Sequence, residues 1–256
     1  MKVRLLPSSA GRKSQLQSLT SFIVDDRLAI DGGSLGFALT PKEIGSLRHV
    51  IVTHAHSDHI ASLPIYIAEA FPTLEAPILI YATSEVVSAL RQFIFNDHVW
   101  PNFENIQLNN GSGPGLEFRE LKPRETVNID GINVTPIPVN HIVPTVGILV
   151  QNEVTAVLFT SDTYTTDEIW KVAAAAGPLK AIFVDISYPN ERRELAEASK
   201  HLTPELLPAE LKKLGRDVEV YAVHIKPTQR DMVIRELMDL GDPRVSIGEV
   251  DRVYEW

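Results

Sequence analysis

The sequence predicts an α/β fold in which two β-sheets pack face to face with helices outside them. The chain has 256 residues, of which 44% are hydrophobic and 22% charged, a balance typical of one large globular domain. Strand and helix patterns alternate at both ends of the chain, and a run of short strand patterns fills residues 116–160. Because no Gly/Ser-rich or Pro-rich linker interrupts it, we expect a single domain over residues 1–256.

The amino-terminal part alternates strands with helices. Apolar and β-branched runs predict strands at residues 2–6, 20–24, 28–31, 49–53 and 78–81. A helix is expected to begin at Thr40-Pro41-Lys42-Glu43, where Thr40 and Glu43 can form a capping box and proline can take the first helical position. Apolar periodicity predicts further helices at 60–70 and 84–95.

The middle of the chain is rich in strands, and helices return after it. Strands are expected at 116–121, 127–129, 132–139, 146–150 and 156–160, separated by turn signals such as Asp130-Gly131. Residues 165–168 form a second capping-box pattern and predict a helix start. Strands at 181–186 and 219–223 and helices from 203 and over 230–240 complete the pattern, which does not give strand order.

Charge and composition exclude several classes of protein. Lysine and arginine total 24 against 33 aspartate and glutamate residues, a formal net charge of −9 that argues against binding long nucleic acid. The chain has no cysteine, which excludes disulfides and thiolate metal sites. It also has no apolar run long enough for a membrane span, and the amino terminus turns polar too early for a signal peptide. We expect a cytoplasmic protein.

The segment His54-Ala55-His56-Ser57-Asp58-His59 is the most informative part of the sequence. Three histidines and one aspartate lie in six residues, directly after an apolar strand and before a helix. In an extended segment residues two apart point the same way, so His54 and His56 can bind one ion. After the turn, Asp58 and His59 can face a second ion. Imidazole and carboxylate are ligands that borderline divalent metals prefer.

Three further candidate ligands lie downstream. His141, Asp162 and His224 each follow an apolar strand, where loops can converge on a site. Singly, each residue is a weak signal, because a histidine at a strand end is more often a local hydrogen-bonding group. Together with the HxHxDH segment they predict a metal centre assembled from distant parts of the chain.

This set of motifs resembles the metallo-β-lactamase superfamily. The resemblance implies an αβ/βα four-layer sandwich with a two-metal site between the two sheets. It also implies that His54, His56 and His141 hold one metal, that Asp58, His59 and His224 hold the other, and that Asp162 bridges them. Asp31, in Ile30-Asp31-Gly32-Gly33, matches an Asp-x-Gly strand end and would orient ligands rather than bind the metal.

Within the superfamily the chain is most similar to bacterial class II 3′,5′-cyclic nucleotide phosphodiesterases. Five stretches carry the resemblance: HAHSDHIASLP, FNDHVWPNF, HIVPTVG, SKHLTPELLPAELKKL and HIKP. Ser57 stands where that family usually has leucine, and the residues beyond Leu63 depart from its signature. The resemblance implies hydrolysis of a small phosphodiester such as cAMP by two divalent metal ions. Zinc is the first expectation and manganese or iron the alternatives; a homodimer is compatible with it.

Asp58 and His201 are the candidate catalytic residues. His201 precedes an expected helix start and matches the H-x-T histidine of phosphodiesterase and tRNA-nuclease members, which makes it the expected proton donor to a leaving alkoxide. Trp100 either stacks on a purine or packs against its own fold. His98 is expected to be structural, as is His49. Lys226 is expected at the surface, with phosphate contact as the alternative.

Other activities on the same scaffold stay open from the sequence. A tRNA 3′-end endonuclease shares the HxHxDH and H-x-T features but needs a clamping arm and a basic surface, for which residues 102–120 are a short and uncharged or acidic candidate. A diiron oxygen-binding or redox-sensing protein is a second alternative, although flavin-partnered diiron relatives carry a carboxylate where His56 stands. A lactone or β-lactam hydrolase is a third, but it leaves His201 without a task.

Overall fold

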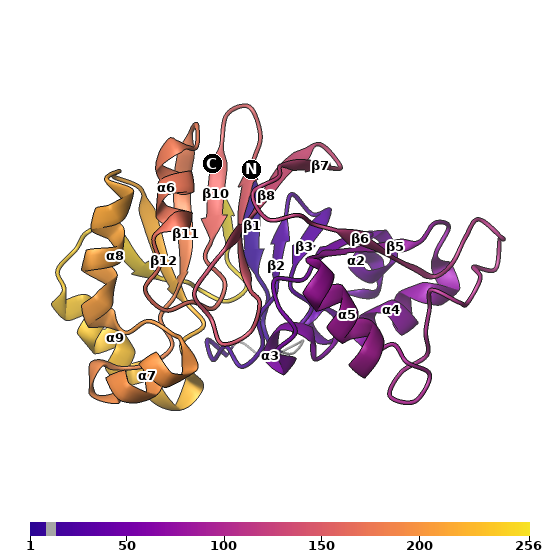
Figure 1. Ribbon diagram of the computed structural model, residues 1–256, viewed down its shortest axis with the longest axis horizontal. Coiled ribbons are helices and arrows are strands. Elements are labelled where there is room, and N and C mark those ends of the chain that lie inside the picture. The colour runs from indigo at the N-terminus through magenta and orange to yellow at the C-terminus, as the bar shows by residue number, and fades with distance from the viewer. Residues whose placement is uncertain (9–13) are drawn as a thin grey trace.

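Two mixed sheets of seven strands form the centre of the computed structural model, which describes residues 1–8 and 14–256 (Figure 1). The first sheet has the order β14-β1-β2-β3-β4-β5-β6, and the second has the order β13-β12-β11-β10-β9-β8-β7. The strands are β1 Lys2–Leu5, β2 Phe22–Val24, β3 Leu28–Ile30, β4 His49–Ile51, β5 Ile78–Ala82, β6 Leu116–Glu120, β7 Val127–Ile129, β8 Ile132–Pro138, β9 Val146–Gln151, β10 Ala156–Phe159, β11 Leu179–Asp185, β12 Glu219–Val223, β13 Val245–Ile247 and β14 Val253–Glu255.

Both sheets repeat one pairing scheme. In the first, β14, β1, β2 and β3 pair antiparallel, and β3, β4, β5 and β6 pair parallel. In the second, β7 to β10 pair antiparallel and β10 to β13 pair parallel. Parallel strands need crossover helices, and these helices cover the outer faces of both sheets.

Helices form the outer two layers of the molecule (Figure 1). Those on the first sheet are α1 Leu35–Ala38, α2 Pro41–Ser46, α3 Ser57–Ile60, α4 Leu63–Ala70 and α5 Ser84–Phe93, with a 3₁₀ turn at Phe71–Thr73. Those on the second are α6 Glu168–Ala175, α7 Arg193–Ser199, α8 Leu207–Leu214 and α9 Arg230–Asp239, with 3₁₀ turns at Asn190–Arg192, Pro204–Leu206 and Pro227–Gln229. No helix among the described residues is long and apolar enough to cross a membrane.

Three apolar clusters fill the spaces between the four layers. One lies under the helices of the first sheet and another under the helices of the second. The third joins the facing surfaces of the two sheets, where Phe22 of β2 meets Phe159 of β10 and Phe183 of β11 with ring centroids 4.9 and 5.2 Å apart. The predicted α/β sandwich, with two sheets face to face and helices outside, is therefore confirmed.

The first predicted capping box is confirmed and the second is wrong. Thr40 Oγ1 accepts from the Glu43 N–H, and the Glu43 carboxylate accepts from the Thr40 N–H at 2.8 Å. At the second, α6 begins at Glu168 with the N-cap two residues beyond Thr165. The Glu168 carboxylate, which the predicted capping box needs, instead forms an ion pair with the Arg124 guanidinium at 2.9 Å.

Other differences concern short elements. The helix expected over 60–70 is two helices, α3 and α4, with a break at Ala61 and Ser62. Helix α7 and strands β13 and β14 were not predicted; each of these strands has only three residues, too few for a periodic signal. Residues 9–13, part of the polar amino-terminal stretch, lie outside the described residues.

Candidate metal centre

Seven predicted ligands meet at the carboxyl ends of strands from both sheets. The HxHxDH segment follows β4, while His141 follows β8, Asp162 follows β10 and His224 follows β12. They form two groups, each with its ligand atoms within 4.8 Å of one another. The first cluster is His54, His56, His141 and Asp162, and the second cluster is Asp58, His59, Asp162 and His224.

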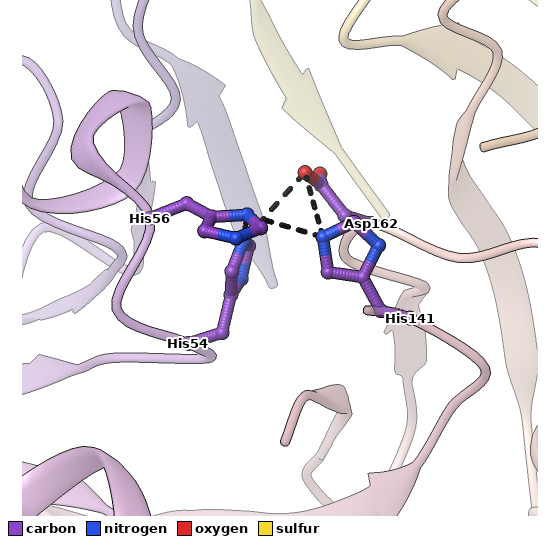
Figure 2. Close-up of side chains that lie close together, drawn as sticks. All are labelled: His54, His56, His141 and Asp162. Atoms are coloured by element: carbon purple, nitrogen blue, oxygen red, sulfur yellow. Dashed lines mark hydrogen bonds and ion pairs between the residues drawn. The ribbon is translucent and has the colours of Figure 1, made fainter. Parts of the chain in front are cut away.

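The first cluster brings three imidazoles together with one carboxylate (Figure 2). The Nδ1 atom of His56 lies 3.1 Å from Nε2 of His54 and 3.1 Å from Nε2 of His141. The Oδ2 atom of Asp162 lies 3.6 Å from Nε2 of His54 and 3.9 Å from Nε2 of His141. Nitrogen atoms this close, all facing one point, are the arrangement expected of ligands around a cation.

The second cluster has two imidazoles and two carboxylates. Nε2 of His224 lies 3.1 Å from Oδ2 of Asp58 and 3.5 Å from Oδ1 of Asp162. Nε2 of His59 lies 3.2 Å from the same Asp162 oxygen. One oxygen of Asp162 therefore faces the first cluster and the other faces the second, so a single carboxylate is common to both.

The loop that carries the second-cluster ligands is held by Asp31. Its carboxylate accepts from the Thr53 N–H at 2.8 Å and from the His59 Nδ1–H at 2.7 Å. Asp31 itself has a φ of 62°, a strained conformation typical of functional sites. Glycine at position 33 allows the backbone of Asp58 to approach closely, because a Cβ at Gly33 would lie 2.1 Å from the backbone oxygen of Asp58.

Hydrogen bonds on the outer side of the other rings fix which nitrogen faces inward. The Nδ1–H of His141 donates to the carbonyl of Lys200 at 3.1 Å, and the Nδ1–H of His224 donates to Ser187 Oγ at 2.9 Å. Nδ1 of His54 lies 3.1 Å from the Thr53 hydroxyl. Each contact leaves Nε2 as the nitrogen that faces the centre, the usual arrangement of metal-binding histidines.

Burial controls the titration of the first cluster. It lowers the pKa of His54 well below the usual histidine value, and it also lowers the pKa of His56 and of His141. These three rings are therefore neutral at pH 7. Neutral imidazole is the form that binds a metal ion.

Carboxylates control the titration of the second cluster. Burial opposes a charge on His59 and His224, but Asp162 beside both rings outweighs it and raises the pKa of His59 well above its usual value and the pKa of His224 to about 9. Burial also opposes ionisation of Asp58, but the pKa of its carboxyl is lowered because His224 hydrogen-bonds to it. Without a metal ion, the protonated rings of His59 and His224 therefore balance the negative charge of the second-cluster carboxylates. A divalent cation can supply that positive charge instead.

The donor set fits a metal ion on structural grounds. His59 is 1% exposed, and among the described residues its buried Nε2 atom makes no well-formed hydrogen bond, although Asp162 Oδ1 lies 3.2 Å away. A buried ring nitrogen that faces a carboxylate without a good hydrogen bond is satisfied better when a cation binds between them. Nitrogen and oxygen donors in this combination suit zinc, manganese or iron. The two clusters can therefore hold divalent metal ions.

His201 lies beside the clusters as one member of an Asp–His pair. Its Nδ1–H donates to Oδ2 of Asp185 at 2.7 Å, and its ring stacks on His224 with centroids 5.4 Å apart. Ser187 Oγ donates to the other Asp185 oxygen at 2.7 Å. Burial would raise the pKa of Asp185, but the facing His201 lowers it to about 2, so this carboxylate is ionised at pH 7.

Asp185 and Ser187 are site residues that the sequence reasoning missed. Asp185 ends β11, an apolar strand, as Asp162 follows the apolar strand β10. The signal that identified Asp162 was therefore present at Asp185 as well. Ser187 follows two residues later and has no sequence signal of its own.

Of the other residues considered in the sequence analysis, some pack within the fold or are exposed, and one lies at the site. Trp100 packs on the apolar cluster under the helices of the first sheet, which supports the packing interpretation. Nδ1 of His49 contacts the Tyr81 hydroxyl at 3.1 Å on the first sheet, and His98 is exposed. Lys226, expected at the surface, is only partly exposed: its side chain is 29% exposed, and its Nζ lies 3.2 Å from Oδ2 of Asp58.

Sequence comparisons relate the chain to one protein family and to two kinds of relative. A family model described as a beta-lactamase superfamily domain matches residues 34–225. The chain is 26% identical over 220 residues to a probable 3′,5′-cyclic-nucleotide phosphodiesterase of Yersinia pestis, covering 75% of this chain and 61% of that protein. It is 28% identical over 142 residues to a ribonuclease Z of Mycobacterium bovis, covering 52% of this chain and 50% of that protein.

The fold is similar to that of solved structures at low sequence identity. Unliganded yeast PDE1 aligns with a TM-score of 0.80 at 17% identity, covering 98% of both chains. By contrast, this chain spans only 61% and 50% of the length of the two curated relatives above.

Proposed function

The chain belongs to the beta-lactamase superfamily, and we propose that it is a metal-dependent phosphodiester hydrolase. The specific activity we propose is that of a class II-like 3′,5′-cyclic nucleotide phosphodiesterase, with cAMP as the first substrate to test. Similarity to a probable enzyme of this kind over 75% of the chain supports the choice. The proposed substrate is a small molecule, not a long nucleic acid.

The observation that carries the proposal is the position of Asp162 between the two clusters. Its Oδ2 faces His54 at 3.6 Å and its Oδ1 faces His59 at 3.2 Å, so two cations bound here would be neighbours. We assign one divalent cation, zinc first, to each cluster. Such a pair supplies Lewis-acid charge for a phosphate oxygen and a water whose pKa is near neutrality.

His201 is the proposed proton donor to the leaving alkoxide. Asp185 accepts from its Nδ1–H at 2.7 Å, which leaves Nε2 as the nitrogen that can carry the transferred proton. The same hydrogen bond also fixes the orientation of the ring. A lactone or β-lactam substrate has no comparable need for this Asp–His pair.

The candidate arm and the net charge disfavour a tRNA and so favour a small diester. Residues 102–120, the candidate clamping arm, pack onto the protein through the buried side chains of Phe103 and Leu108. Asn110 Nδ2 at its tip donates to the carbonyl of Glu75 at 3.0 Å. The formal net charge of −9 also disfavours a polyanion.

A nucleotide panel with metal-reconstituted protein tests the proposal. We expect hydrolysis of 3′,5′-cyclic nucleotides at least tenfold faster, in kcat/KM, than of 2′,3′-cyclic nucleotides, linear dinucleotides or a tRNA with a 3′ trailer. The Asp162→Ala variant is the background control. Cleavage of the tRNA alone, or of no diester, would refute the assignment. Metal analysis with an optical spectrum accompanies it, because an oxo-bridged diiron pair is coloured and zinc is not.

A further inference from the structure

The side-chain ammonium of Lys226 lies next to the second cluster. Its Nζ lies 3.2 Å from Oδ2 of Asp58 and 3.5 Å from Nε2 of His224, and these are two of the atoms assigned to the second cation. Its side chain is 29% exposed, so one end of the space around it opens to solvent. A lysine ammonium so close to ligand atoms competes with a metal ion for the same electrons.

The first cluster has no such charge. In the described parts of the chain, residues 1–8 and 14–256, Asp162 forms ion-pair contacts with histidine rings and with no lysine or arginine. The second cluster contains one more carboxylate than the first, that of Asp58, which by itself would make it the tighter cation site. Lys226 offsets that additional negative charge.

We infer that the positive charge of Lys226 weakens metal binding at the second cluster. The first cluster then binds its ion first, and the ion of the second cluster is the one that exchanges more readily. Without the ion, the ammonium pairs with Asp58. When the ion binds, Lys226 gives up Asp58 and turns toward solvent, which its partial exposure permits. The inference rests on the two cation sites proposed above, but not on the identity of the substrate.

Variants that isolate each cluster allow a direct test. His56→Ala removes a ligand of the first cluster only, and Asp58→Ala removes a ligand of the second only. Calorimetric titration of Co²⁺ or Zn²⁺ into each metal-free variant then reports one site, with the cobalt absorption spectrum as a second readout. Adding Lys226→Met to the His56→Ala protein should tighten binding about tenfold, as expected for removing a partly exposed charge next to the ion.

Matched controls separate charge from structure. Lys226→Arg in the same background keeps the charge and should leave the affinity within twofold of its parent. Lys171→Met removes an exposed lysine on α6 and should also leave it within twofold. Lys226→Met in the Asp58→Ala background should not change first-cluster affinity. Lys226→Gln provides a second neutral side chain in case the methionine variant folds poorly.

Unchanged or weaker binding after Lys226→Met in the His56→Ala background would overturn the inference. A change in KM for the diester with unchanged metal affinity would also overturn it and would assign Lys226 to phosphate binding instead. The proposed function fails separately: a chain that binds two cations, responds to Lys226→Met and hydrolyses no phosphodiester would refute the activity and leave the inference standing.

Discussion

The two sheets share one layout and build the same pair of side chains, but use it differently. Asp31 follows β3 in the first sheet and accepts from the Nδ1–H of His59 at 2.7 Å. Asp185 ends β11 in the second sheet and accepts from the Nδ1–H of His201, also at 2.7 Å. His59 faces Asp162 and is assigned to a cation, whereas His201 stacks beside the cluster and is assigned to proton transfer. The two Asp–His pairs have the same geometry, so the proposed roles differ only because of what surrounds each ring.

The two sheets also differ in how they supply the candidate ligands. The first contributes four from the continuous segment 54–59, whereas the second contributes His141, Asp162 and His224 from the ends of three separate strands. If one candidate ligand of the segment 54–59 is substituted, the others in that segment can keep their positions. Asp162 has no such substitute, because both clusters share it.

Removing Asp162 should therefore have the largest effect. We expect Asp162→Ala, after metal reconstitution, to retain fewer than one ion per chain and to lose on the order of 10³-fold or more in phosphodiester turnover. His56→Ala should retain the second-cluster ion. Elemental analysis after gel filtration distinguishes the two variants. Full activity of Asp162→Ala would refute the site.

The next largest effect should come from His201 and should depend on the leaving group. His201→Ala should keep the metal content of the wild type but slow cyclic nucleotide hydrolysis by about 10²- to 10⁴-fold, the usual contribution of general acid catalysis. Turnover of bis(p-nitrophenyl) phosphate, whose leaving group needs little protonation, should fall far less. Equal losses on both substrates would remove His201 from the acid role.

Amide substitutions of the two aspartates test the comparison of the sheets directly. Asp31→Asn should lower metal affinity by about 10- to 100-fold, the usual cost of losing a partner that orients a ligand. Asp185→Asn should leave most metal bound and lower turnover instead, by about 10- to 100-fold. The same loss of metal in both variants would show that the two pairs do not differ in role.

The smallest effect concerns the two predicted capping boxes. Thr40→Ala should lower the free energy of unfolding by about 1 kcal/mol, because it removes the acceptor of the Glu43 N–H. Thr165→Ala should change it by less than about 0.5 kcal/mol, since α6 begins two residues further on, with Asp167 at the N-cap position. Denaturant titration measures both, and equal losses would contradict this difference between the two helices.

The sequence predicted most regular elements and all seven residues that gather in the two clusters. Strands such as β12 Glu219–Val223 are short runs of apolar residues, which is a local signal, and the HxHxDH segment places four candidate ligands in six consecutive residues. Failures occurred where a distant group competes with a local pattern. At Glu168, Arg124 takes the carboxylate that the predicted cap needed, and no local pattern contains that partner.

Sequence alone determined the fold class and predicted which side chains form the candidate metal centre, because apolar periodicity and ligand types are properties of neighbouring residues. Only the tertiary structure decided that Asp162 presents one oxygen to each cluster and that Asp185 holds His201. It also decided that Lys226 lies against Asp58, a contact between residues 168 positions apart. These distances of a few ångströms depend on how two sheets pack, and no stretch of sequence encodes that packing by itself.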